Sequence, residues 1–339
     1  MVTTVLMTNA RDMLGNAAKL ACDRGELEDT LFADDTLLIA GDKESMEKLL
    51  HLVEDISGCF GLKLNKDKCV VLIIQGGDPP KFTDGTTVKQ ESGTEYLGSN
   101  INTKGDTDEE AIKRIRVARY IWNKLQTFWL HAPLPKKVIL EVYNSLIRSK
   151  LLYSLESARM TNRIASRINA FHLQGLRRIL KLQTTFVNRN NTNELVYAHA
   201  NLVANISEEE KKIGPLSDYI EDRAIKLIAD ILKAPNSDPR RQVCFYPDSG
   251  LIVRTEKLRQ YGPRVHWLNQ TINRMWDKFE IWRNLDSDAY VKYNEQDLDQ
   301  TDSILQAAKQ GLFDGWTDLG NWEMRTAPNS ITLRPHTHT

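Results

Sequence analysis

The sequence predicts an α+β protein in which short antiparallel strands precede a long helical region. Between Thr30 and Ile101, short apolar runs are separated by Gly, Asp, Asn and Pro residues, a pattern typical of strands and hairpins. From Asp108 to about Lys181, apolar residues instead recur with the 3.6-residue period of helices. The chain has 339 residues, 41% of them hydrophobic and 27% charged, so it is long enough for two or three domains with their own cores.

The first third of the chain is expected to contain two helices, a hairpin and several short strands. Apolar residues on one side of 1–22 predict the first helix, and the pattern of 30–40 predicts the hairpin. Asp42 is a suitable N-cap for an amphipathic helix at 43–60, and Gly61 is suited to end that helix. Further short strands are expected at 62–65, 69–74, 86–89 and 95–101.

Helices are expected along most of the remaining sequence. Pro133 and Pro135 interrupt the helical period, which restarts in a helix over 136–153. Later helices are expected at 216–232, 265–282 and 301–313. These patterns divide the chain into four predicted parts: a mixed part at 1–107, a basic helical part at 108–185, a helical extension at 186–283 and an acidic, weakly ordered tail at 284–339.

Cysteine usage and hydropathy indicate an intracellular protein, nuclear or cytoplasmic. The cysteines form neither a CxxC pair nor a Cys/His cluster, which predicts buried free thiols in a reducing compartment and no zinc site. They are Cys22, Cys59, Cys69 and Cys244. No apolar run approaches the roughly 18 residues of a membrane span, and the first residues lack the basic start of a signal peptide.

The formal charge is zero overall, but it is unevenly distributed. Between residues 111 and 190, sixteen Lys and Arg face only two acids, Glu141 and Glu156, which gives this segment a net charge of +14. A basic block of this size is typical of a surface that binds a polyanion. Acidic partners one helical turn away, which support an ordinary exposed helix, are nearly missing. Solvated helix faces are the alternative interpretation.

Two adjacent acids, Asp34 and Asp35, interrupt the apolar run of the first predicted hairpin. Neighbouring carboxylates repel each other and lose hydration when half-buried, so a compensating charge is expected. A divalent cation held by carboxylate oxygens would supply that charge, and such a site suits phosphoryl transfer. A plain turn is the alternative, because Asp is a common turn residue.

Several motifs occur in one order along the first half of the chain. They are Phe32-Ala33-Asp34-Asp35, Gly61-Leu62-Lys63-Leu64-Asn65-Lys66-Asp67-Lys68, Glu95-Tyr96-Leu97-Gly98-Ser99 and a helix from Ala170 to Leu180. Together with the basic helical region, this order resembles the C-terminal half of the reverse transcriptase of non-LTR (LINE-type) retrotransposons. The resemblance covers about residues 1–185 and continues more weakly to 282.

The resemblance implies a partial palm at 1–107, a thumb at 108–185 and a C-terminal extension at 186–283. Asp34 and Asp35 would then be catalytic residues that bind Mg²⁺ weakly. Lys68 would lie near an incoming triphosphate, although a solvated turn lysine is an equal alternative. Tyr96 and Gly98 would shape a hairpin under the primer end. The basic residues implied to contact RNA or DNA phosphates are Arg114, Arg116, Lys124, Lys136, Lys137, Arg148 and Lys150.

The family's complete enzyme takes its first metal-binding carboxylate and its fingers from sequence that lies before the first helix predicted here. We therefore expect an RNA-directed DNA polymerase fragment that is inactive alone, with deoxynucleoside triphosphates as substrates only of the complete enzyme. A non-catalytic nucleic-acid-binding protein and a structural protein derived from such an enzyme are the alternatives. The aromatic residues Trp122, Phe128 and Trp129 fit a helix core better than base stacking.

Overall fold

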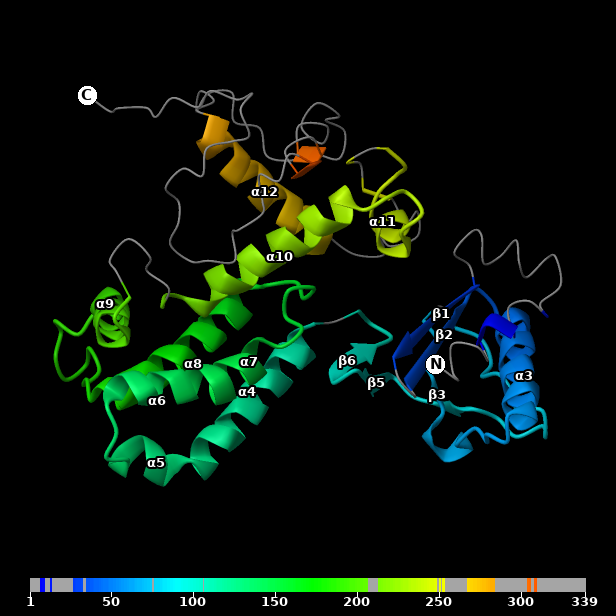
Figure 1. Cartoon of the computed structure of the whole chain (residues 1–339), viewed down its shortest axis with the longest axis horizontal. Coiled ribbons are helices and arrows are strands. Elements are labelled where there is room, and N and C mark those ends of the chain that lie inside the picture. Colours follow the sequence, from blue (N-terminus) through cyan, green and yellow to red (C-terminus); the bar gives the residue numbers. More distant parts are fainter. Residues whose placement is uncertain are drawn as a thin grey trace. The chain divides into compact units, whose positions relative to one another are not determined.

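The computed structural model describes residues 7–9, 13, 27–32, 35–74, 76–105, 107–206, 213–248, 250, 252–253, 267–283, 304–305 and 308–309. The chain divides into two compact units, Met1–Glu110 and Ala111–Thr339. Figure 1 shows strands and one long helix in the first unit and an almost entirely helical second unit. This mixture agrees with the predicted α+β class.

The predicted hairpin forms in the first unit. Strands β1 (Leu27–Phe32) and β2 (Asp35–Ala40) pair antiparallel, in a register that sets Phe32 opposite Asp35. Helix α3 (Lys43–Cys59) follows as predicted, and its N-cap Asp42 accepts a hydrogen bond from the Ser45 amide at 2.9 Å. The chain leaves α3 through Gly61, whose φ of +71° is the left-handed conformation that favours glycine.

Beyond α3 the strands are shorter than expected. The predicted strand at 62–65 is absent, and a 3₁₀ turn, η1 (Lys66–Lys68), comes next. The strand predicted at 69–74 is reduced to β3 (Val70–Val71), which pairs with β4 (Lys89–Gln90). Because β4 offers only two residues as partner, the ladder ends at Val71, and Ile74 is 74% exposed instead of buried.

The predicted Tyr-Leu-Gly hairpin forms. Strands β5 (Gly93–Tyr96) and β6 (Ser99–Asn102) pair antiparallel around the two-residue turn Leu97-Gly98. Both turn residues have positive φ, 49° and 78°, as a type I′ hairpin turn requires. The Glu110 carboxylate accepts a hydrogen bond from the backbone amide of Asn100 at 2.8 Å, so the hairpin is attached to the first turn of the next helix.

The helices of the second unit follow the predicted period closely. They are α4 (Asp108–Lys124), α5 (Gln126–His131), α6 (Lys136–Tyr143), a π-helical turn η2 (Asn144–Arg148), α7 (Ser149–Leu152), α8 (Asn162–Leu180), α9 (Asn193–Ala204), α10 (Leu216–Lys233), α11 (Pro239–Cys244) and α12 (Trp267–Arg283). The helix predicted over 136–153 is thus continuous through the π turn.

Two hydrophobic clusters fill the described part of the second unit. The first joins α4 to α10 and contains Trp122 and Trp129, whose stacked rings lie 4.7 Å apart. This confirms that these tryptophans belong to the core. The second cluster joins α10 to α12 and includes Leu268 and Met275. Helix α10 therefore contributes its first residues to one cluster and its later residues to the other.

Several predictions concern residues that the structure describes only in part or not at all. Within the predicted helix at 1–22, only Met7–Asn9 and Met13 are described, and they are helical. Of 301–313, only 304–305 and 308–309 are described, also as helix. Of the predicted tail at 284–339, the structure describes only these same residues, and Cys22 lies outside the described residues. Among the other cysteines, Cys59 is exposed, which corrects the expectation of a buried thiol: it is the last residue of α3 and lies beyond that helix's buried face.

Candidate nucleic-acid interface

The hairpin that carries the acidic pair is only partly described. Asp34 lies outside the described residues, and Asp35 is the exposed first residue of β2. Burial, with a smaller contribution from the negative charge of Asp35, raises the pKa of Tyr96. The charge of Asp35 on one hairpin therefore acts on Tyr96, a predicted site residue of a separate hairpin. Within the described ranges, no group of three His, Cys, Asp or Glu residues could hold a metal ion, so magnesium binding remains a prediction.

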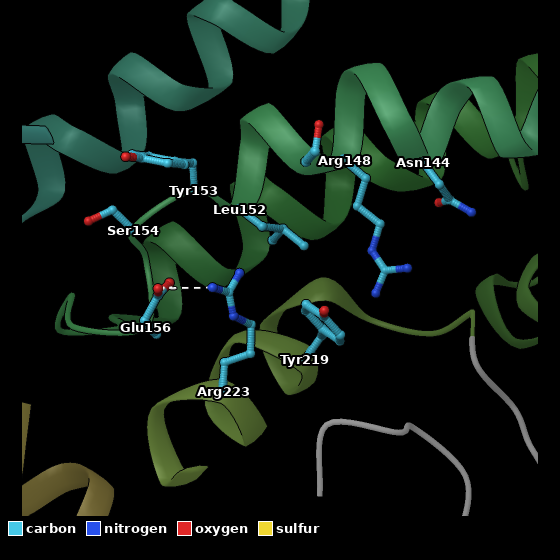
Figure 2. Close-up of a pocket in the computed structure, with 9 residues that line it drawn as sticks. Asn144, Arg148, Leu152, Tyr153, Ser154, Glu156, Tyr219 and Arg223 are labelled. Carbon is cyan, nitrogen blue, oxygen red and sulfur yellow. Dashed lines mark hydrogen bonds and ion pairs between the residues drawn. The ribbon is translucent and has the colours of Figure 1, made fainter. Parts of the chain in front are cut away.

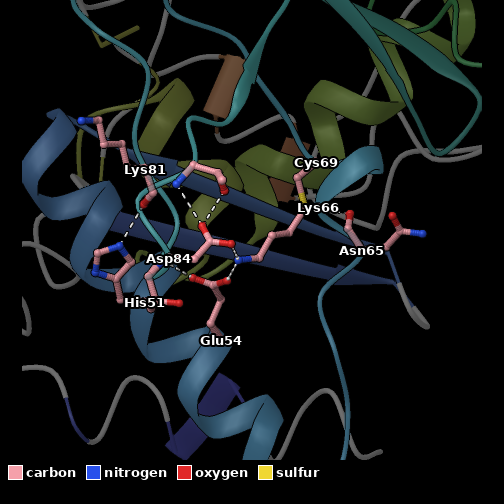
Figure 3. Close-up of polar contacts among 9 residues, drawn as sticks. His51, Glu54, Asn65, Lys66, Cys69, Lys81 and Asp84 are labelled. Carbon is pink, nitrogen blue, oxygen red and sulfur yellow. Dashed lines mark hydrogen bonds and ion pairs between the residues drawn. The ribbon is translucent and has the colours of Figure 1, made fainter.

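The motif that contains Lys68 has a second lysine with a structural role. Lys68 is exposed, whereas Lys66 forms ion pairs with Asp84 at 2.7 Å and Glu54 at 3.0 Å (Figure 3). Its ammonium group also lies 4.8 Å from the ring centre of Phe82. These contacts raise the pKa of Lys66, mainly through the hydrogen bond to Asp84. Lys66 thus connects α3 to the loop near residue 84. Lys68, the last residue of the motif, remains an exposed cation.

The outer face of α4 is the clearest basic surface of the second unit. Arg116, Arg119 and Lys124 are exposed and follow helical spacing, so they lie on one side of the helix. Tyr120 lies on the same side with 58% of its surface exposed, and the Lys124 ammonium sits 4.7 Å from its ring centre. An accessible aromatic ring among cations is typical of surfaces that bind single-stranded nucleic acid. Tyr120 is not among the residues predicted from the sequence, although its spacing from Arg116 identifies the shared face.

Helices α6 and α7 add two exposed lysines. Lys137 is in the first turn of α6, and Lys150 is in the short helix α7. Both remain accessible to a phosphate backbone. We define the α4 basic face as Arg116, Arg119, Tyr120 and Lys124, and treat the two lysines as additional exposed cations of the same unit.

Other residues that the sequence predicts to contact phosphates interact with the protein itself. Arg114 is only 7% exposed, and its guanidinium lies 4.7 Å from the ring centre of Tyr153. Lys136 donates a hydrogen bond to the carbonyl of Leu180 at the end of α8, 3.0 Å away. These two residues face the protein because their helices pack against distant segments. We therefore leave these two residues out of the surface assigned to nucleic acid, and their contact with phosphates stays a prediction.

A buried arginine outside the predicted set shapes the loop after α8. Arg177 donates hydrogen bonds to the carbonyls of Gln183 and Asn191, at 3.0 and 2.8 Å, and to the side chain of Asn193 at 3.1 Å. Charged donors satisfy buried carbonyls strongly. Part of the basic block predicted from sequence therefore serves loop structure rather than the surface.

No protein-family model matches this chain, and no solved structure matches it. The chain is similar to an uncharacterized transposon-derived protein of Caenorhabditis elegans, with 26% identity over 159 residues. The aligned region covers 45% of this chain and 57% of the relative, so the chain spans a little over half of that protein's length. This similarity supports a transposon origin, and the relative's description does not mention reverse transcription. In the described part of the chain, no helix has both the length and the apolarity needed to cross a membrane.

Proposed function

We propose that this chain is a transposon-derived protein, related to the reverse transcriptase of non-LTR retroelements, whose second unit binds the backbone of RNA or DNA. The observation that carries the binding proposal is the α4 basic face within a segment of net charge +14. Eleven helical and loop cations of this segment remain exposed after folding: Arg116, Arg119, Lys124, Lys137, Lys150, Arg159, Arg163, Arg167, Arg178, Lys181 and Arg189.

The relationship to reverse transcriptases is supported by order and local geometry. The chain contains, in the order expected for the palm and thumb of that family, the Asp35 hairpin, α3, the Tyr96 hairpin and a helical region. The electrostatic influence of Asp35 on Tyr96 is compatible with a palm in which the metal-binding hairpin and the primer-grip hairpin are neighbours. The transposon-derived relative points to the same origin.

The parental reaction would be RNA-templated DNA synthesis with Mg²⁺ and deoxynucleoside triphosphates. If Mg²⁺ binds, the carboxylates of Asp34 and Asp35 are the residues that would hold it, and the ion would stabilise charge on the transferred phosphoryl group. Two carboxylates supply fewer than the roughly six oxygens that Mg²⁺ requires, so its affinity in this chain should be weak. Backbone binding is therefore the function that we propose for the isolated chain, without primer extension.

If phosphate contacts dominate binding, they predict how steeply the binding constant falls as the salt concentration rises. Each phosphate contact to a single strand contributes about −0.7 to the slope of log K against log salt. Five contacts would give a slope of about −3.5. No described element shows a recognition helix arranged for a groove, so different sequences of equal length should bind within about tenfold of one another.

The test compares two variants with the same change in charge. In the first, Arg116, Arg119 and Lys124 are replaced by Glu; in the control, the exposed Lys63, Lys81 and Lys104 of the first unit are replaced by Glu. Fluorescence anisotropy with an unstructured RNA and the matching DNA gives the affinity between 50 and 300 mM salt. The α4 variant should flatten the slope by about 2, which is three lost contacts.

The control variant should retain the slope of the unmutated chain. A salt-independent affinity in the unmutated chain, or equal effects of the two variants, would contradict the assignment of binding to the α4 basic face. Template-dependent nucleotide incorporation that disappears in Asp34→Ala would instead favour polymerase activity over simple binding.

A further inference from the structure

A pocket of about 500 Å³ lies between the α6–α7 helical segment and α10 (Figure 2). Its lining includes Asn144 and Arg148 from the π turn, and Tyr219 and Arg223 from α10. Glu156, from the segment after α7, completes the charged part of the wall. Pockets of this volume accept ligands of nucleotide size.

Arg148 is a half-buried cation without a matching anion. Its guanidinium carbon lies 4.3 Å from the ring centre of Tyr219, and within the described residues no acceptor forms a hydrogen bond with it. Burial lowers the pKa of Arg148; Tyr219 and Tyr143 partly offset this effect, and the charge of Arg223 adds a smaller lowering. A guanidinium carries five N–H donors, so partial burial without an acceptor leaves strong hydrogen-bonding capacity unused.

The π turn Asn144–Arg148 determines which residues face this pocket. A π turn contains one more residue than an α turn, which rotates the following side chains by about 100° relative to an uninterrupted α-helix. Helical insertions of this kind are frequent at functional sites. Here the inserted turn places Asn144 and Arg148 in one wall of the pocket.

Arg223 already has an anionic partner. Its guanidinium contacts Glu156 at 2.9 Å, and Figure 2 shows this pair on the side of the pocket opposite Asn144. The second oxygen of the Glu156 carboxylate is buried and has no hydrogen-bond partner. The charged side chains of the lining are thus two arginines and one glutamate, which leaves one positive charge, that of Arg148, uncompensated.

We propose that this pocket binds a phosphate monoester, with Arg148 as the principal ligand and Asn144 and Tyr219 as additional hydrogen-bond donors. A phosphate monoester presents three oxygens and close to two negative charges, so two oxygens can engage the Arg148 fork while the third reaches another donor. The source is either a free nucleotide or the phosphorylated end of a nucleic-acid strand. Only the second source rests on the proposed function, because it requires the chain to bind nucleic acid.

The first experiment uses inorganic phosphate as the probe and the full chain as the protein. Isothermal titration at constant ionic strength, with sodium chloride as the reference, compares the unmutated chain with Arg148→Gln and Asn144→Ala. The control is Arg189→Gln, a change at an exposed arginine outside the pocket. We expect Arg148→Gln to weaken phosphate binding at least tenfold and Asn144→Ala a few-fold, while the control binds as the unmutated chain does.

Asn144→Ala keeps the test valid if Arg148→Gln perturbs folding, because the Asn144 side chain lines the pocket and forms no hydrogen bond with the described residues. Unchanged phosphate affinity in both pocket variants would overturn the proposal. So would an unmutated chain that binds phosphate no better than chloride.

The second experiment distinguishes the two sources. Binding of a 5′-phosphorylated oligonucleotide is compared with that of the same strand bearing a 5′-hydroxyl, each with and without a nucleoside monophosphate as competitor. A preference of fivefold or more for the phosphorylated strand, lost in Arg148→Gln, assigns the site to a strand end. Phosphate and nucleotide binding without any oligonucleotide binding assigns the site to free nucleotides and contradicts the proposed function alone.

Discussion

The contact between Gly175 of α8 and Tyr143 of α6 allows a sharp test of how these helices pack. A Cβ atom added at Gly175 would lie 2.9 Å from Cε2 of Tyr143, closer than real carbon atoms approach. Tyr143 is fully buried, and its hydroxyl forms a 2.9 Å hydrogen bond with Nδ1 of His172. The rings of Trp122 and Trp129 meet it edge-on at 5.9 and 6.5 Å, so the tyrosine ring has little room to move.

We therefore expect Gly175→Ala to lower the free energy of unfolding of the second unit. Overpacking a rigid core costs about 1–3 kcal/mol. Replacing a helical glycine by alanine contributes about 1 kcal/mol in the opposite direction. With the steric cost near the top of its range, the net loss is about 2 kcal/mol, or roughly 4–8 °C in Tm for a unit of this size.

The assay is urea or thermal unfolding followed by tryptophan fluorescence. All seven tryptophans of the chain lie after residue 111, so this signal reports on the second unit. The matched control is Gly214→Ala, because a Cβ at Gly214 meets nothing within 4 Å. Its effect should stay within about 1 kcal/mol of zero. Equal stability of Gly175→Ala and the unmutated chain would refute the close approach of α6 and α8.

Two further predictions concern buried polar groups of the second unit. Burial lowers the pKa of His172 to about 3, so between pH 6.5 and 3 the unfolded chain binds a proton that the folded chain does not. Stability should therefore fall as the pH falls through this window, by about 2–3 kcal/mol at pH 4.5, and urea midpoints should depend less on pH in His172→Gln. Arg177→Met should cost about 3 kcal/mol, because the buried carbonyls that Arg177 serves lose a charged donor. It should also speed proteolysis near Gln183, whereas the same change at the exposed Arg178 should do neither.

The predictions that held rest on local chemistry. Helix α3 was predictable because its apolar residues recur with the helical period of 3.6 residues and because the Asp42 side chain can cap its first turn. The hairpin at Leu97-Gly98 was likewise marked by its sequence, since Gly tolerates the positive φ that the turn requires. In each case the decisive interactions join residues only a few positions apart.

The strands after α3 differ from the prediction because they depend on partners that are distant in the sequence. Residues 69–74 have the composition of a buried strand, but a strand needs a partner, and β4 offers only two residues. Hydrogen bonding between strands depends on segments far apart in the sequence. The expected strand therefore shortened to Val70–Val71, and Ile74 became exposed.

The candidate interface also depends partly on the sequence alone and partly on the tertiary structure. The sequence by itself determined that residues 111–190 are strongly basic, because charge is a property of composition. Only the tertiary structure decided which cations stay on the surface. Arg114 lies under Tyr153 and Arg177 holds a loop through Asn191, whereas Arg116 remains exposed on α4. The burial of a long charged side chain is set by the distant groups that pack over it, and a helical period alone does not identify them.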